Sequence, residues 1–305
     1  MANITAHQSA TTTKLLLIGH SGSGKTGALA SLAAAGYKLR ILDFDNGLDI
    51  LRNYVTDPSS PYVKANPKVA ENIDYVTCTD KMRNVAGNIM CAKAEAWQRA
   101  TQMLVHWTYE EKQADGSVKK VDLGKITEWG ADTILAVDSL SMAATAALNF
   151  HLQMNGKLGQ ARTQNEARRD IGATQGHLRK MLELLYDDSI KCNTIVNSHI
   201  TMVTESGLGP QSEEFKEQGN GEAPKGFPSA IGRALSPIIP RFFNSVLFID
   251  TAGSGASAKH RIYTRSQGAI LVKTTAPLRV RPDYDIAQGL AEYFAAVRES
   301  PKVPS

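Results

Sequence analysis

Short apolar runs that end in glycine or in a polar residue recur along the first two thirds of the chain. These runs are Lys14–Gly19, Lys38–Asp43, Ile73–Val76, Asp132–Leu140 and Asn193–Ile200. The pattern is typical of strands that are buried on both faces of a sheet. Helical spacing of apolar residues follows at Thr26–Ala35 and at Gln164–Tyr186. Strands that alternate with helices predict an α/β fold with a mostly parallel central sheet flanked by helices.

A different pattern precedes Asp132–Leu140. Polar and apolar residues alternate on both sides of Asp115-Gly116, a dipeptide that favours a tight turn. We therefore predict a β-hairpin insertion at about residues 105–130. Much of the stretch before it, Met82–Val105, has helical character.

The last third of the chain contains a predicted loop and a second group of strands. Residues 204–226 are rich in glycine and glutamate and predict a long mobile loop. The runs Asn244–Asp250, His260–Ser266 and Ala269–Thr274 predict C-terminal antiparallel strands, and Ile286–Val297 predicts a short helix. No linker divides the chain, so we expect one domain at 14–298 between a flexible arm at 1–13 and a flexible tail at 299–305.

The composition and the pattern of cysteines indicate a cellular compartment and the kinds of partner to expect. Hydrophobic residues make up 42% of the chain and charged residues 21%, which is ordinary for a soluble globular protein. No apolar run approaches the roughly 20 residues that span a bilayer, and the N-terminus has no secretory signal pattern. Three cysteines without a CxxC pair or a histidine cluster argue against a disulfide or zinc framework. These features predict a cytoplasmic protein without a membrane partner, and the net charge of +4 permits a polyanionic one.

The segment GHSGSGKT follows the first predicted strand and opens the first predicted helix. It matches the phosphate-binding pattern G-x-x-x-x-G-K-[ST] in the context that this pattern requires. Glycines let the backbone wrap a phosphate, and successive N–H groups then point toward it. Lys25 would contact the β- and γ-phosphates of ATP, and the Thr26 hydroxyl would ligate Mg²⁺. The nucleotide-binding residues predicted here are Gly19, His20, Ser21, Gly22, Ser23, Gly24, Lys25, Thr26 and Gly27.

A P-loop ATPase also needs a carboxylate near the metal, at the end of another buried strand. The run ILAVDSL supplies Asp138, which would bind Mg²⁺ through water with support from Ser139. The alternative is an ordinary aspartate at the end of a strand that begins a turn. The complete P-loop favours the metal interpretation.

The segment Ile41–Asp49 resembles the RecA family, in which a strand ends in an acidic segment of the form D-A-E-H-A-L-D. Asp43 and Asp49 match the flanking aspartates, and Asp45 takes the place of the glutamate that polarises the attacking water. Aspartate is one methylene shorter, so the water would sit closer or react more slowly. The alternative is a capping cluster at a strand end, because aspartate and asparagine also favour turns.

The resemblance to the RecA family extends to the strand IVNSHI. In that family the corresponding strand ends in Asn-Gln, and the glutamine senses the γ-phosphate. His199 or Ser198 would take this role here, because a neutral imidazole can donate a hydrogen bond to phosphate. A structural histidine at the end of a strand explains the same residue equally well.

More narrowly, the chain resembles phage-encoded RecA-like ATPases annotated with an AAA domain, including the Sak-type core-only proteins that promote single-strand annealing. The stretches LLLIGHSGSGKT, ILDFDNG, EWGADTILAVDSLS, TIVNSHI and LVKTTAPL carry this resemblance. It implies a RecA-like core acting on single-stranded DNA in an infected bacterial cytoplasm, with a single-strand-binding protein as a further partner.

The resemblance places DNA loops after the strands that end in Asp138 and in IVNSHI. The first of these contains the basic residues Lys157, Arg162, Arg168 and Arg169, which suit phosphate contacts. A solvated helix face explains Arg168 and Arg169 equally well. The second loop, Thr204–Gly226, is net acidic, which does not favour a grip on DNA.

The resemblance also implies a homo-oligomer with ATP between subunits and a cation supplied by the neighbouring copy. Lys273 matches that cation best by position, and Arg261 and Arg265 lie in the same late segment. Protection of an edge strand by basic side chains is the alternative.

Three function hypotheses follow. The leading one is a Mg²⁺-dependent ATPase of phage recombination or replication that acts on single-stranded DNA. The second is a nucleotide-gated protein-interaction switch that has little need for hydrolysis. A small-molecule kinase is disfavoured, because the loop at 204–226 is acidic where such enzymes carry an arginine-rich lid.

Overall fold

The computed structural model describes residues 11–85, 87–113, 115–203, 224–232, 234–253 and 258–298. Its strands are β1 (Lys14–Gly19), β2 (Lys38–Asp43), β3 (Ile73–Thr77), β4 (Lys81–Val85), β5 (Asn88–Lys93), β6 (Trp107–Lys112), β7 (Val118–Gly124), β8 (Thr133–Asp138), β9 (Asn193–Val203), β10 (Lys225–Pro228), β11 (Ser245–Ala252), β12 (Lys259–Tyr263) and β13 (Asp283–Asp285). Its α-helices are α1 (Lys25–Ala34), α2 (Asp49–Thr56), α3 (Pro61–Ala65), α4 (Ala96–Met103), α5 (Leu140–Met154), α6 (Gln164–Tyr186) and α7 (Gly289–Arg298).

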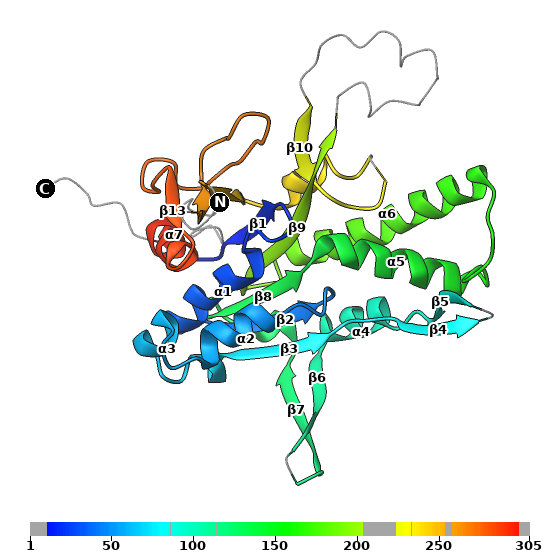
Figure 1. The fold of residues 1–305 in the computed structure, drawn as a ribbon, viewed down its shortest axis with the longest axis horizontal. Coiled ribbons are helices and arrows are strands. Elements are labelled where there is room, and N and C mark those ends of the chain that lie inside the picture. The colour runs from blue at the N-terminus through cyan, green and yellow to red at the C-terminus, as the bar shows by residue number, and fades with distance from the viewer. Residues whose placement is uncertain are drawn as a thin grey trace, which may run out of the picture.

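The central sheet runs in the order β13-β12-β11-β1-β9-β8-β2-β3 (Figure 1). From β11 to β3 in this order, each pair of neighbouring strands is parallel. Strands β12 and β13 continue the sheet antiparallel, and β10 pairs antiparallel with the end of β9. The predicted fold class is confirmed, including the mostly parallel sheet, the flanking helices and the C-terminal antiparallel strands.

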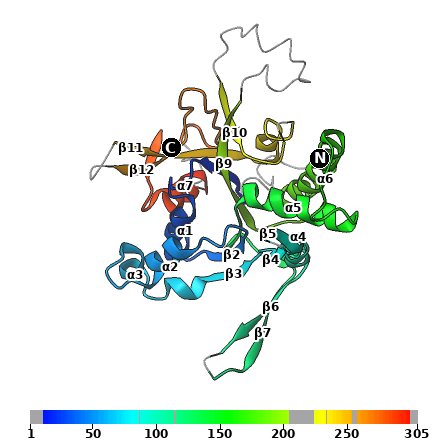
Figure 2. The ribbon, with the colours of Figure 1, turned by 45° about the vertical axis from the view of Figure 1, so that its right-hand side comes forward.

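Helices cover both faces of the central sheet (Figures 1 and 2). An apolar core lies on each face. Alternate residues of one strand divide between them: Leu16 and Ile18 belong to one core, and Leu15 and Leu17 to the other. Helices α4, α5 and α6 cover the first face, and α1, α2, α3 and α7 cover the second. The continuous apolar runs in the sequence reflect this burial on both sides.

The inserted hairpin forms as β6 and β7, which pair antiparallel and project from the body of the molecule (Figure 1). Its base is buried: the rings of Trp107 and Trp129 pack with centroids 5.6 Å apart. None of the helices among the described residues is long and apolar enough to cross a bilayer.

The helical expectation for Met82–Val105 is wrong over its first half. Residues 81–93 form the antiparallel pair β4–β5, and α4 covers only Ala96–Met103. The segment contains Ile89, which is β-branched and loses rotamer freedom in a helix, and Gly87 adopts a positive φ of 84°. Spacing alone did not distinguish a short hairpin from a short helix.

Other boundaries also differ from the sequence predictions. Thr12 and Thr13, assigned to the arm, are buried, and the Thr13 N–H donates to Asn193 Oδ1 at 2.9 Å. The run at 269–274 makes isolated bridges rather than a strand, and the last helix begins at Gly289. Residues 1–10, 299–305 and most of the predicted loop, 204–223, lie outside the described residues.

Candidate nucleotide-binding site

The P-loop leaves the carboxyl end of β1 at the centre of the sheet. Gly22 and Gly24 have φ values of 76° and 97°, in the left-handed region that other residues rarely adopt. A Cβ at Gly19 would lie 2.5 Å from Ile249 O, and one at Gly24 would lie 2.4 Å from Ile286 Cδ1. The loop therefore needs glycine both for its turn and for its close contacts with β11 and with the residue that follows β13.

Polar groups in this loop have free bonding capacity. Ser23 Oγ is buried without a hydrogen-bond partner. Among the described residues, no backbone acceptor is recorded for the N–H groups of Gly24, Lys25 and Thr26 at the start of α1. A helix N-terminus with unsatisfied donors attracts anions, so this cradle fits a phosphate group.

The Lys25 side chain is 6% exposed and folds back over the loop. Its ammonium group donates to Gly19 O at 2.9 Å and to His20 O at 2.8 Å. Burial lowers the pKa of Lys25, and the nearby carboxylates of Asp138 and Asp45 oppose this shift. A phosphate in the cradle would bring negative charge beside this ammonium.

Asp138 ends β8 and lies beside the first turn of α1. The Thr26 hydroxyl donates to Asp138 Oδ2 at 2.6 Å, and Asn197 Nδ2 donates to Asp138 Oδ1 at 3.1 Å. Burial raises the pKa of Asp138, which is 3% exposed. Thr26 and Asp138 thus present oxygen atoms of the kind that Mg²⁺ prefers, next to the phosphate cradle.

Asn197 was not predicted from the sequence. It lies on β9, is 1% exposed, and its Oδ1 is buried without a partner. The resemblance to the RecA family assigned the γ-phosphate sensor to Ser198 or His199, the two residues that follow Asn197. The family motif Asn-Gln contains an asparagine as well, and this was the signal in the sequence that pointed to Asn197. Parallel pairing of β8 with β9 brings this side chain to Asp138.

Asp45 lies beyond the end of β2, across from β8. Ser139 Oγ donates to Asp45 Oδ1 at 2.8 Å, and His199 Nε2 lies 3.9 Å from Asp45 Oδ2. Burial, followed by the charge of Lys25, lowers the pKa of His199. The structure therefore brings Asp45 and His199 together near Asp138, whereas Ser198 is buried and donates to its neighbour's carbonyl group.

Asp43 is the more deeply buried carboxylate of the acidic segment. Its side chain accepts the Gly47 N–H at 3.3 Å, and burial raises the pKa of Asp43 to about 6. Asp43 pairs in register with Asp138 across β2 and β8. Its bond to Gly47 holds the turn that presents Asp45.

Lys273 lies away from this group. Its backbone bridges Val246 near the start of β11, and Val246 pairs with Leu16, three residues before Gly19 on β1. The Lys273 side chain is partly exposed, and burial lowers its pKa. Among the described residues, Lys273 therefore stands apart from the group formed by Thr26, Asp138 and Asn197.

The predicted DNA-contact residues divide into two pairs. Lys157 Nζ and Arg162 Nη1 each lie 3.3 Å from a carboxylate oxygen of Asp170, whose side chain is 3% exposed. Arg168 and Arg169 lie on exposed positions of α6. The first pair is therefore engaged within the protein, and the second lies at exposed positions.

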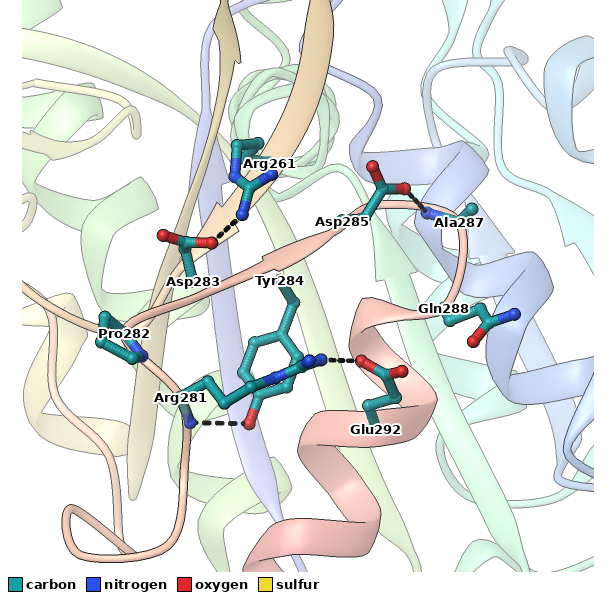
Figure 3. Close-up of a pocket in the computed structure, with 9 residues that line it drawn as sticks. All are labelled: Arg261, Arg281, Pro282, Asp283, Tyr284, Asp285, Ala287, Gln288 and Glu292. Atoms are coloured by element: carbon teal, nitrogen blue, oxygen red, sulfur yellow. Dashed lines mark hydrogen bonds and ion pairs between the residues drawn. The ribbon is translucent and has the colours of Figure 1, made fainter.

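A cavity of about 570 Å³ is lined by residues of β12, of β13 and its flanking segments, and of α7 (Figure 3). Its charged groups are paired: Arg261 bonds Asp283, and Arg281 bonds Glu292. The Arg281 guanidinium also stacks over the Tyr284 ring, 4.5 Å from its centroid. Arg261, one of the late cations considered for a neighbouring active site, is therefore engaged in its own chain.

Comparisons with known proteins give structural likeness only. No protein-family model matches the chain, and no curated protein matches it. The KaiC-like protein PH0186 from the hyperthermophilic archaeon Pyrococcus horikoshii OT3 is 13% identical, with a TM-score of 0.38 over 91% of this chain and 87% of that chain. The flagellar accessory protein FlaH from Methanocaldococcus jannaschii is 11% identical, with a TM-score of 0.35 over 91% of this chain and 80% of that chain. At these scores, a functional conclusion depends on the residues of the site itself.

Proposed function

We propose that the protein binds ATP with Mg²⁺ and hydrolyses it. One observation carries the proposal: the Thr26 hydroxyl, Asp138 and Asn197 form a hydrogen-bonded group at the mouth of a phosphate cradle with unsatisfied N–H donors. Thr26 and Asp138 would hold Mg²⁺, which supplies charge neutralisation at the phosphates when bound. Lys25 would exchange its two carbonyl acceptors for phosphate oxygens.

Asp45 and His199 are the candidates for work on the attacking water. Asp45 Oδ2 is the carboxylate oxygen that Ser139 leaves open, and it faces His199. A carboxylate fixed by a hydroxyl group can accept a proton from water or orient it. His199, kept neutral by its lowered pKa, can donate a hydrogen bond to a phosphate oxygen.

The test is ATP binding and turnover by the purified chain with Mg²⁺. Lys25→Ala should weaken binding of a labelled ATP analogue and lower turnover by about 100-fold or more, because each charged transition-state contact contributes about that much. Lys119→Ala, on the exposed hairpin strand β7, is the matched control and should change neither. Saturable binding that is absent, or that survives unchanged in Lys25→Ala, contradicts the proposal.

The finer proposal assigns this ATPase to phage recombination or replication on single-stranded DNA. It is supported by the resemblance to core-only RecA-like proteins and by the exposed Arg168 and Arg169. Turnover should rise when oligothymidine is added, and the rise should shrink as salt increases. No stimulation and no salt-dependent binding would remove the DNA part and leave the ATPase.

An oligomer with ATP at the subunit interface belongs to the same proposal. Lys273, which is exposed in its own chain, would then reach the γ-phosphate of the neighbouring copy. Mixing Lys273→Ala with Lys25→Ala chains should restore part of the turnover, because each defect lies in a different half of the site. No restoration would exclude a role for Lys273 in trans. A single-strand-binding protein remains a proposed further partner, to be tested by co-purification on DNA.

A nucleotide-gated interaction switch is the second candidate. The observation that favours it is the engagement of Asp45 Oδ1 by Ser139, which leaves a short carboxylate with one open oxygen. Asp45→Asn separates the two functions. If this variant binds ATP, does not hydrolyse it and keeps its biological activity, hydrolysis is dispensable.

A further inference from the structure

Strand β9 is longer than its neighbour β8 and changes partners part-way along its length. Its parallel pairing with β8 ends where Val137 meets Val196, and its antiparallel pairing with β10 begins where Ile200 meets Pro228. Figure 1 shows β9 extending past the end of β8 to pair with β10. Between these two pairings, the backbone groups along this edge of β9 need other hydrogen-bond partners. His199, the candidate phosphate contact, lies in this interval.

The hydroxyl group of Ser141 supplies one of these partners. Ser141 is the second residue of α5, and its Oγ accepts the His199 N–H at 3.1 Å. The same hydroxyl donates to Ser229 O at 3.1 Å, and the Ser229 N–H donates to His199 O at 2.6 Å. Ser229 O also accepts the Ser198 hydroxyl at 3.3 Å, so it keeps a donor without Ser141. The group that depends on the Ser141 hydroxyl is therefore the backbone N–H of His199.

The start of α5 also holds Asp45, the other candidate for work on the attacking water. The Ser139 hydroxyl donates to Asp45 Oδ1 at 2.8 Å, and Ser139 stands two positions before Ser141. His199 Nε2 and Asp45 Oδ2 lie 3.9 Å apart. These four residues form a closed ring of contacts. One short stretch of chain thus fixes the separation of two side chains that come from β9 and from the turn after β2.

The backbone of His199 controls where its ring lies. Among the described residues, no hydrogen bond to the imidazole ring is recorded, and its nearest charged neighbour is Asp45. The His199 side chain is 33% exposed, so packing encloses it only in part. A displacement of about 1 Å in a reacting site can cost about 100-fold in rate. The bond from the His199 N–H to Ser141 is therefore placed to affect turnover.

We propose that Ser141 is the positioning residue for His199 in ATP turnover. Its hydroxyl holds the backbone of β9 so that the imidazole faces Asp45 and the γ-phosphate of bound ATP. This inference deepens the proposed ATPase function and rests on it. The recorded bonds of the Ser141 side chain go to His199 and Ser229 and not to the P-loop, so Ser141 acts on turnover and not on binding of the diphosphate.

The experiment compares ATP turnover and ADP affinity of the full chain and of Ser141→Ala, below the thermal midpoint of both. The kcat should fall about 10-fold, because the ring loses its fixed position. ADP lacks the γ-phosphate and should bind with unchanged affinity. Thr145→Ala removes an exposed hydroxyl one turn further along α5 and is the matched control, which should change neither quantity. Ser141→Thr keeps a hydroxyl at this position and should retain most of the turnover.

A double-mutant cycle separates positioning of His199 from a general loss of stability. His199→Ala removes the ring itself, so Ser141→Ala should lower kcat no further in that background. A 10-fold loss in both backgrounds would overturn the proposal, because Ser141 would then act on another group. Full turnover in either single variant, or an ADP affinity that falls together with turnover, would overturn it as well. Turnover in Ser141→Thr as slow as in Ser141→Ala would exclude the hydroxyl as the group responsible.

Amide hydrogen exchange tests the contact without nucleotide. The His199 N–H should exchange faster in Ser141→Ala than in the parent chain and in Thr145→Ala, and an unchanged rate would refute the proposal. A parent chain that neither binds nor hydrolyses ATP would refute the proposed function together with this role of Ser141. A parent chain that hydrolyses ATP at the same rate as Ser141→Ala would refute the role of Ser141 alone.

Discussion

Asp138→Asn should stabilise the protein without ligand and remove most of its stabilisation by ATP and Mg²⁺. Asp138 is 3% exposed, and its raised pKa indicates that burial disfavours the charged carboxylate. The substitution removes that charge with little change of shape. Its new amide can still accept from Asn197, and it can donate to the Thr26 hydroxyl, so both hydrogen bonds can persist.

The magnitude follows from opposing contributions. Relief of a buried charge is worth a few kcal/mol, whereas the hydrogen bonds weaken when the acceptor loses its charge and Lys25 loses an attractive neighbour. The net gain should be about 1 kcal/mol, or a rise of roughly 2 °C in the thermal midpoint. With ligand at about 100 times its dissociation constant, the parent chain gains about 2.7 kcal/mol. A 100-fold weaker variant gains only about 0.4 kcal/mol.

The assay is thermal unfolding of the parent chain and the variant, each with and without ATP and Mg²⁺. Without ligand the variant should melt at a higher temperature than the parent chain. The rise in melting temperature on adding ATP and Mg²⁺ should be smaller for the variant than for the parent chain. Asp188→Asn, at an exposed position near the end of α6, is the control and should alter neither. A variant that is less stable without ligand, or that keeps the full ligand shift, would refute this account of Asp138.

Three further outcomes are expected. Asp43 binds its proton more tightly when folded, because its pKa is raised from 3.8 to about 6, so stability should fall as pH rises through this window. Asp43→Asn should remove up to about 3 kcal/mol of that pH dependence in urea unfolding, and an unchanged pH profile would contradict it. Asp170→Asn should lower the free energy of unfolding by about 2–3 kcal/mol. This is less than for a fully buried ion pair, because the side chains of Lys157 and Arg162 are 35% and 25% exposed. A urea midpoint like that of the parent chain would show that Asp170 does not stabilise the fold through these two cations. Gly24→Ala should destabilise the chain by at least about 1–2 kcal/mol and impair ATP binding. Gly36 is the control, because it has a similar φ of 92° but open space around it. Gly36→Ala should cost only the backbone strain and leave ATP binding intact.

Sequence patterns predicted a structural feature correctly where one continuous segment contains all the residues that the feature needs. The P-loop needs a strand, glycines with positive φ and a helix start, and all of these are consecutive in the chain. The β6–β7 hairpin depends on alternation around one turn, and Asp115-Gly116 supplied it. Segments near 81–93 have no such marker, since a short ribbon and a short helix differ little in composition.

The site required contacts that no segment contains. Asn197 meets Asp138 only because β9 lies next to β8, and the two residues are 59 positions apart. Asp170 neutralises Lys157 and Arg162, so basic residues that look available for DNA in the sequence are partly occupied. The number of basic residues in this segment therefore overstated the positive charge that is available to a partner.

The sequence by itself determined the phosphate cradle and the alternation of buried strands with helices, because backbone conformation and burial depend on neighbours a few positions apart. Only the tertiary structure decided which side chains meet Asp138, which cations remain exposed, and that the β4–β5 hairpin projects beside the connection between α5 and α6. Those outcomes depend on strand order and on packing between distant segments, because the partners of these hydrogen bonds and ion pairs lie on different elements.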